Sequence, residues 1–315
     1  EAFVELGANP EILYQNNPHV GTDGIRLLVM AMRKEILRLG GEFRFDTRLE
    51  EVITAEGQVT ELRLDHGEVL ETGLLVLATG HSARDTNRML LDAGLPFEVK
   101  PFSIGVRIEH QASFINKSQY GREDQWTKTL LGSSDYHLTY KGERGVYSFC
   151  MCPGGIVVPS NSFEQEVVTN GMSYASRAGS LSNSAIVVTV GQEDFGNDPY
   201  EALLFQENLE KRGFEATGKG YKALGQNPRD FVDRQGSQEI QVEFTPSYKP
   251  GIHLGNFWDL LPEKVCEELR LGLLDFDRKI PGFIDQGFLT GPETRTSSPI
   301  RLKRDEGLKV LGYNN

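Results

Sequence analysis

The fold predicted for this chain depends on one stretch, LLVLATGH at residues 74–81. Its first five residues are apolar at consecutive positions, which is typical of a strand buried on both faces of a parallel sheet. The strand leads into Thr79-Gly80, and glycine lacks the Cβ that would keep a ligand away from the backbone. A helix expected at about residues 83–93 would offer free N–H groups to an anion. These residues predict either a ligand-binding turn or an ordinary strand-to-helix turn.

The residues before this stretch predict more of an α/β domain. A helix is expected to begin after the N-cap Thr22 and to end at Gly40-Gly41. Its apolar residues recur on one face at helical spacing, and they are Ile25, Leu28, Val29, Met32, Ile36 and Leu39. A short strand at 43–45 and a meander over 49–54, 58–64 and 68–71 follow. Residues 1–19 are expected to be irregular, with breakers at Asn9-Pro10, Asn16, Asn17 and Pro18.

A second pattern begins at Pro101, where strands alternate with loops rich in glycine, serine and asparagine. Two helices are expected later, from Pro199 to about Lys211 and from Pro262 to about Phe276, each with proline near its first position. Strands are expected at 102–109, 136–140, 146–151, 156–158 and 186–190. The sequence therefore predicts that residues 1–100 with 295–315 form one partial nucleotide-binding domain, and that residues 101–294 form a separate α+β domain.

The composition excludes several partners. A net charge of −12 argues against nucleic acid and anionic lipid, because both require a basic surface. No apolar run approaches the roughly 20 residues that cross a bilayer, so no membrane partner is expected. Three cysteines do not form a disulfide framework, which favours a reducing, cytoplasmic location.

The cysteines Cys150 and Cys152 form a C-x-C motif followed by Pro153-Gly154-Gly155. In a regular strand, residues two apart lie about 6.5–7 Å from each other on the same face, which strains a disulfide between them. No metal is expected, because no ligand-spaced group of histidines accompanies the pair. Two interpretations remain: small buried thiols at a strand end, or a substrate-facing or redox role.

Two further segments carry charge. Arg107 and Glu109 share a strand face, whereas His110 points the other way; a surface ion pair with a partly exposed histidine is the alternative to a catalytic role. The segment ETRTSSPIR at 293–301 places Arg295 among hydroxyl side chains. It predicts either an anion-binding loop or a polar return between domains.

Several stretches together resemble bacterial FAD-dependent dehydrogenases of the NAD(FAD)-utilizing type. The similar segments are PHVGTDGIRLLV at 18–29, LATGHSARDTNRML at 77–90, KPFSIGVRIEH at 100–110, YSFCMCPGG at 147–155, VTNGMSYASR at 168–177, NSAIVV at 183–188 and ETRTSSPIR at 293–301. The resemblance implies a partial FAD/NAD(P)-binding, Rossmann-like domain with a β-meander and an inserted mixed-sheet domain, hence an α/β plus α+β fold. It also implies that Leu49, Ala78, Thr79, Gly80 and His81 meet the adenosine side of FAD.

The resemblance also implies two further FAD-binding regions, an N-terminal Rossmann glycine loop and a C-terminal glycine-rich segment. Neither is seen in this sequence, which has no G-x-G-x-x-G after a strand. We therefore expect an interior fragment: FAD is expected in the full-length protein, and little FAD and no activity are expected in these 315 residues alone.

The expected function is flavin hydride transfer by an oxidoreductase of unknown substrate. The expected partners are a small-molecule substrate and NAD(P)H, and a homodimer is a further expectation. The candidate catalytic residues are Arg107, His110, Cys150, Cys152 and Arg295. The alternative is a flavin-fold protein that binds a ligand or partner without turnover.

Overall fold

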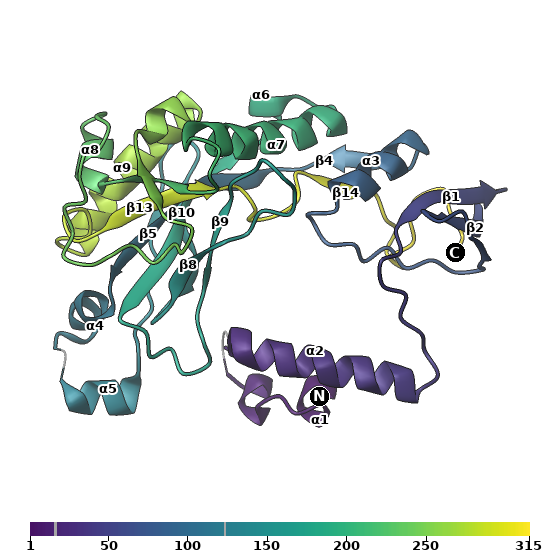
Figure 1. The fold of residues 1–315 in the computed structure, drawn as a ribbon, viewed down its shortest axis with the longest axis horizontal. Coiled ribbons are helices and arrows are strands. Elements are labelled where there is room, and N and C mark those ends of the chain that lie inside the picture. The colour runs from purple at the N-terminus through teal and green to yellow at the C-terminus, as the bar shows by residue number, and fades with distance from the viewer. Residues whose placement is uncertain (16–17, 123) are drawn as a thin grey trace. The chain divides into compact units, whose positions relative to one another are not determined.

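The computed structural model describes residues 1–15, 18–122 and 124–315 (Figure 1). Asn16 and Asn17, two of the predicted breakers, lie outside the described residues. The chain divides into two compact units. The larger unit comprises Glu1–Gly41, Ser103–Thr189 and Asn208–Thr296, and the smaller unit comprises Glu42–Phe102, Val190–Glu207 and Ser297–Asn315.

The core of the larger unit is a seven-stranded sheet with the order β12-β11-β13-β5-β10-β7-β6. Figure 1 labels its strands β5, β10 and β13. Every residue of β5 apart from Gln111 is buried, and every residue of β10 apart from Thr189. These two strands are rich in Val and Ile, which suits a buried pleated surface. The strands are β5 Phe102–Gln111, β6 Thr139–Tyr140, β7 Val146–Cys152, β10 Leu181–Val190, β11 Ala223–Gln226, β12 Ile252–Leu254 and β13 Phe288–Glu293.

A two-stranded sheet of β8 (Ile156–Pro159) and β9 (Thr169–Met172) adds to this unit, and β9 contacts β7 and β13. The helix α9 packs against β6 and β7. Helices of this unit and those reaching into it are α1 Ala2–Glu5, η1 Pro10–Leu13, α2 Gly21–Arg38, α4 Ala112–Tyr120, α5 Gln125–Leu131, α7 Pro199–Ala216, α8 Pro228–Val232, η2 Phe257–Asp259 and α9 Glu263–Lys279.

The helix predicted after Thr22 is present as α2, but the predicted N-cap was wrong. The helix begins at Gly21 after the N-cap Val20, which makes no side-chain cap. Thr22 instead directs its backbone N–H and its hydroxyl to the carbonyl of Ser173, at 3.2 and 3.4 Å. Only Gly21 and Leu28 of α2 are buried among the described residues, so most of the predicted apolar face is exposed.

The smaller unit contains the predicted meander, which is confirmed as β1 (Leu49–Ala55), β2 (Gln58–Leu64) and β3 (Val69–Glu71). The predicted helix after Gly80 is also confirmed, as α3 (Arg84–Asp92). A small core of Val52, Val59, Leu90 and Leu95 joins the meander to α3. The remaining elements of this unit are β4 Phe97–Val99, α6 Gln192–Phe195 and β14 Ile300–Leu302, and β14 pairs with β4.

The two predicted strands at 43–45 and 74–78 were wrong, because neither stretch is a strand. Leu75 and Leu77 pack against the small core, whereas Leu74 and Val76 are 68% and 77% exposed. A central strand needs a hydrogen-bonded neighbour on each side, and no strand of the described chain pairs with residues 74–78. The apolar run therefore lacks the sheet that its composition indicates.

In the second half, the predictions at 102–109, 146–151, 156–158 and 186–190 correspond to β5, β7, β8 and β10. The strand expected at 136–140 is shorter, because only Thr139–Tyr140 is paired. Both predicted helices are confirmed as α7 and α9. The sequence did not predict β9 or β13, since TNGM and FLTGPE contain residues typical of turns.

The mixed α/β class is confirmed by these sheets and helices. Among the described residues, no sheet runs across Pro101, and the predicted division at Pro101 and residue 295 stays a prediction. No described helix has both the length and the apolar character needed to cross a membrane.

Candidate functional site: a buried arginine beside two cysteines

Arg107 lies in the middle of β5 and is completely buried. Its Nε and Nη2 donate to the two carboxylate oxygens of Glu293, each at 3.1 Å. Nη1 donates to the carbonyl of Cys150 at 3.1 Å and to Oδ1 of Asn183 at 2.9 Å. Nη2 also donates to Oδ1 of Asn170 at 2.9 Å. A guanidinium has five N–H donors, so every donor of Arg107 is used.

We call this group the Arg107 cluster, and its members are Arg107, Cys150, Cys152, Asn170, Asn183 and Glu293. Burial raises the pKa of Glu293, and the facing charge of Arg107 opposes that shift. The charge of Glu293 in turn raises the pKa of Arg107 against the effect of burial. The two-pronged ion pair satisfies both groups inside the protein, where either charge alone would be costly.

Gly171 in β9 allows the backbone to approach Arg107 closely. A Cβ at this position would lie 2.3 Å from Nη1 of Arg107 and 2.3 Å from Oδ1 of Asn183. Any other residue would therefore push the guanidinium away from its acceptors. Gly171 makes β9 hard to predict as a strand, because glycine is typical of turns. The same glycine allows β9 to cover the Arg107 cluster.

Cys150 occupies a β-bulge in β7. Asn183 and Ala185 of β10 face Cys152 and Phe149, so Cys150 and Met151 together oppose the single residue Ser184. Cys150 has a φ of +45°, in the left-handed region that non-glycine residues rarely adopt. Arg107 holds its carbonyl, and bulges redirect side chains relative to a regular strand. The sequence-based spacing for a regular strand therefore does not apply to these cysteines.

The two thiols differ in exposure and in charge. Cys150 is exposed and Cys152 is 6% exposed, and both are free. A hydrogen bond from the Cys152 thiol and the charge of Arg107 lower the pKa of Cys150 to about 5, against the effect of burial. The same hydrogen bond and burial raise the pKa of Cys152. The arrangement thus presents an accessible thiolate next to a protonated, buried thiol.

Glu109 and His110 follow Arg107 on β5, and both are buried. Glu109 accepts hydrogen bonds from the backbone N–H of Ser247 at 3.1 Å and from its hydroxyl; burial raises the pKa of Glu109. The partner of Arg107 is Glu293 and not Glu109. The surface ion pair predicted here as the alternative was therefore wrong.

His110 is enclosed by aromatic rings, with centroids 4.5 Å from Phe283 and 5.4 Å from Phe114. Its Nε2 donates to the carbonyl of Phe283 at 2.8 Å. Burial lowers the pKa of His110 to about 4, so the ring is neutral at pH 7. The predicted partly exposed histidine was wrong, because His110 has no exposed surface.

Arg295 lies in a second buried cluster. It forms ion pairs with Glu210 at 2.7 Å and Glu166 at 3.2 Å, and it donates to the hydroxyl of Ser162 at 2.7 Å. Thr294 also donates to Glu210, at 2.7 Å. The sequence predicted that Arg295 binds an anion, as one of two alternatives. In the structure its guanidinium instead pairs with carboxylates of this chain, and these ion pairs hold the segment that follows β13.

The residues implied for FAD binding lie in the smaller unit. Leu49 begins β1 and packs against the small core, whereas Ala78, Thr79 and Gly80 lie outside any helix or strand and precede a turn at His81. Gly80 has a φ of +74°, and nothing described lies within 4 Å of where its Cβ would be. The Cβ direction at Gly80 is therefore open, and the assignment of Leu49 and residues 78–81 to FAD binding stays a prediction.

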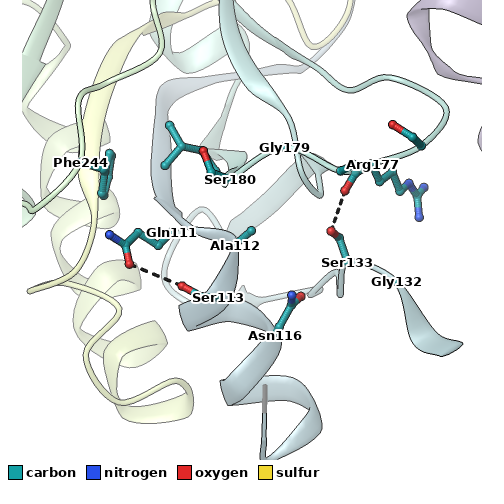
Figure 2. A pocket seen from close by; sticks show the side chains of 13 residues that line it. Gln111, Ala112, Ser113, Asn116, Gly132, Ser133, Arg177, Gly179, Ser180 and Phe244 are labelled. Carbon is teal, nitrogen blue, oxygen red and sulfur yellow. Dashed lines mark hydrogen bonds between the residues drawn. The ribbon is translucent and has the colours of Figure 1, made fainter. Parts of the chain in front are cut away.

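A cavity of about 590 Å³ lies elsewhere in the larger unit (Figure 2). Ser133 donates to the carbonyl of Arg177 at 2.7 Å on one side, and Ser113 to the amide oxygen of Gln111 at 3.4 Å on the other. The only local sign of a cavity here in the sequence is a loop rich in serine and glycine. Its lining includes Gln111, Ser113, Asn116, Ser133, Ser180 and Phe244.

The turn after the cysteines contacts the loop that lines this cavity. The backbone N–H of Gly179 donates to the carbonyl of Gly154 at 3.1 Å, and the hydroxyl of Ser182 accepts the N–H of Gly154, also at 3.1 Å. Because Gly179 lines the cavity, its hydrogen bond links the cavity wall to the turn after the cysteines.

The family described as "FAD-dependent protein, C-terminal domain-like" matches residues 101–296, which contain the whole Arg107 cluster. The chain belongs to this family. An uncharacterized protein of Clostridium beijerinckii is 43% identical over 316 residues, which cover 99% of this chain and 58% of that protein. The chain thus spans 58% of the length of this relative.

Two other similarities are more limited. A phytoene desaturase (neurosporene-forming) of Cereibacter sphaeroides is 40% identical over 58 residues, which are 18% of this chain and 11% of that protein. A crystal structure of a PqsL mutant of P. aeruginosa is 14% identical, with a TM-score of 0.26 over 82% of this chain and 63% of that one. The family assignment rests on residues 101–296.

Proposed function

We propose that this chain is part of an FAD-dependent oxidoreductase of the dehydrogenase type, and that the Arg107 cluster borders its substrate site. The observation that carries the proposal is an exposed thiolate beside a fixed buried guanidinium, inside the region that defines an FAD-dependent family. Strongly shifted pKa values at a partly exposed position are more frequent at functional sites than elsewhere.

The flavin is proposed for the full-length protein and not for this chain alone. The smaller unit, with Leu49 and residues 78–81, is the proposed partial Rossmann-like contribution to FAD binding. Flavin supplies hydride chemistry where it binds, and protein residues supply orientation and charge. A small-molecule substrate, NAD(P)H as donor and a homodimer are parts of the same proposal.

One observation favours a different function, a flavin-fold protein that binds a ligand without turnover. Four of the five candidate catalytic residues are buried and hydrogen-bonded to groups of this chain: Arg107 to Glu293, His110 to Phe283, Arg295 to Glu210 and Cys152 to the carbonyl of Cys150. None of the four offers a proton to the surface in this arrangement. Cys150 is the exposed member of the candidate set.

The experiment is anaerobic titration of the purified full-length protein with NADH and with NADPH, followed by visible absorbance. We expect a flavin spectrum that bleaches with at least one donor and returns on admission of an acceptor. A flavin that neither donor reduces, in protein that is otherwise folded, would favour the binding function. A protein without flavin after reconstitution with FAD would contradict both.

A further inference from the structure

We propose that Cys150 and Cys152 form a redox-active dithiol, which closes to an internal disulfide when a peroxide or a small-molecule disulfide oxidises Cys150. The proposal goes beyond the flavin function and does not depend on it. It rests on the bulge in β7, the unequal exposure of the two thiols and the anchoring by Arg107.

The bulge removes the regular strand spacing that would strain a disulfide between Cys150 and Cys152. Because Cys150 and Met151 oppose one residue of β10 and Cys150 has a φ of +45°, the backbone departs from regular strand geometry within the motif. The Cys152 thiol donates to the carbonyl of Cys150 at 3.4 Å, so its sulfur lies beside Cys150. The turn Pro153-Gly154 and the contact of Gly154 with Gly179 fix the chain directly after Cys152.

The unequal exposure assigns a role to each cysteine. The exposed Cys150 is the thiol that an oxidant in solution can reach, and the buried Cys152 is the thiol that resolves the product. Thiolates are the reactive form of cysteine, and a neighbouring arginine stabilises them. Arg107 is fixed near Cys150 by its five hydrogen bonds, so its charge cannot move away during the reaction.

A further polar group lies across the strand pair. The amide Nδ2 of the buried Asn183 has no hydrogen-bond partner among the described residues, and Asn183 is the register partner of Cys152. Buried donors without a partner are rare in folded proteins. Oδ1 of Asn183 accepts from Arg107, so this amide belongs to the same fixed group as the cysteine motif.

The chemistry with hydrogen peroxide balances in two steps. The Cys150 thiolate attacks one peroxide oxygen, the O–O bond breaks, and hydroxide leaves and takes a proton to become water, which leaves a sulfenic acid on Cys150. The Cys152 sulfur then attacks the Cys150 sulfur, an S–S bond forms, the S–O bond breaks, and a second water leaves. Two thiols are oxidised and one peroxide is reduced to two waters.

With a small-molecule disulfide the same pair reacts by exchange. Cys150 displaces one thiol and forms a mixed disulfide, and Cys152 then displaces the second thiol. Both routes end in the same internal disulfide between Cys150 and Cys152. The proposal therefore requires neither a particular oxidant nor the flavin.

The test uses the full-length protein treated with hydrogen peroxide, or in parallel with oxidised glutathione, then denatured, alkylated and digested with trypsin. Cleavage after Arg144 and Arg177 releases residues 145–177, which contain both cysteines of the motif and no lysine or arginine inside. We expect this peptide to carry no alkyl group after oxidation and two after subsequent reduction. Cys266 is the internal control, because it is completely buried and burial raises its pKa to about 12.

Two variants separate the roles. In Cys152→Ser, the sulfenic acid on Cys150 has no resolving thiol, so we expect a dimedone adduct on that peptide. In Cys150→Ser, we expect the remaining thiol to stay alkylatable after the same oxidation. Thiols that remain fully alkylatable in the wild type, or a Cys150→Ser variant oxidised as fast as the wild type, would overturn the proposal. Flavin reduction is measured separately, so either result leaves the proposed oxidoreductase function to its own test.

Discussion

The strand β13 and the stretch at 74–80 reverse the usual relation between composition and burial. β13 reads FLTGPE, with glycine, proline and a carboxylate, and each of its residues is buried. The stretch LLVLATG is almost entirely apolar, yet Leu74 and Val76 are exposed. The difference lies in the partners: β13 pairs with β5 and β11, and Arg107 satisfies its carboxylate. Burial follows from hydrogen-bonding neighbours as much as from side-chain type.

Removal of Glu293 from β13 is expected to give the largest loss in the free energy of unfolding. In Glu293→Ala, Arg107 loses a buried carboxylate, and we expect the free energy of unfolding to fall by about 3–5 kcal/mol. Denaturant unfolding at pH 7 measures this loss. The control is Glu98→Ala, which removes an exposed partner of Arg301 in the smaller unit and is expected to cost less than about 1 kcal/mol. Equal losses would contradict the assignment of a buried ion pair.

Two glycine substitutions separate close packing from backbone conformation. Gly171→Ala places a methyl group against Arg107, and we expect a loss of about 1–3 kcal/mol together with slower alkylation of Cys150. Gly80→Ala meets no neighbour but adopts a positive φ, which costs about 1–2 kcal/mol. Only Gly171→Ala should change the reactivity of Cys150. An unchanged alkylation rate in that variant would show that Arg107 does not govern the thiol.

The buried histidine predicts a pH dependence of stability. The pKa of His110 falls from 6.5 to about 4 on folding because of burial, so the unfolded state binds the proton more readily. Its contribution is complete above pH 6.5 and is lost as the pH falls toward 4, about 2 kcal/mol between pH 7 and pH 5. Glu109 and Glu293, whose pKa values are raised, act in the opposite direction.

The measurement that isolates this effect is the unfolding free energy of the wild type and of His110→Gln at both pH values. The wild type should lose more stability on acidification than the variant. Parallel behaviour of the two proteins would mean that His110 is already protonated or is not buried.

The smallest expected effect concerns Val76. In the 315-residue chain, Val76→Lys replaces an exposed side chain, and we expect the unfolding free energy to change by no more than about 0.5 kcal/mol. In the full-length protein, the same change should be strongly destabilising if residues 74–78 are a central strand there. A small effect in both proteins would remove the basis for the Rossmann-like proposal.

The sequence predicts the fold where local pattern and pairing agree. The meander at 49–71, the helices α7 and α9 and the buried strands β5 and β10 follow from alternation, helical spacing and flanking turns. It also selected Arg107, Cys150 and Cys152, which the structure brings together. Features that depend on distant partners could not be predicted from local pattern. The pairing of Arg107 with Glu293 and the bulge at Cys150 are two such features, because neither has a local signature in the sequence.

The Arg107 cluster also has a consequence for the order of folding. The acceptors of this guanidinium lie 43, 63, 76 and 186 residues away along the chain, on four different strands. Contacts between such distant segments require long loops to close, and they form slowly. A guanidinium enclosed before all its acceptors arrive would be an unpaired buried charge, which is strongly unfavourable. We therefore expect Arg107 to become buried late in the folding of the larger unit. The reactivity of Cys150, which depends on Arg107, should then appear only when the native sheet is complete.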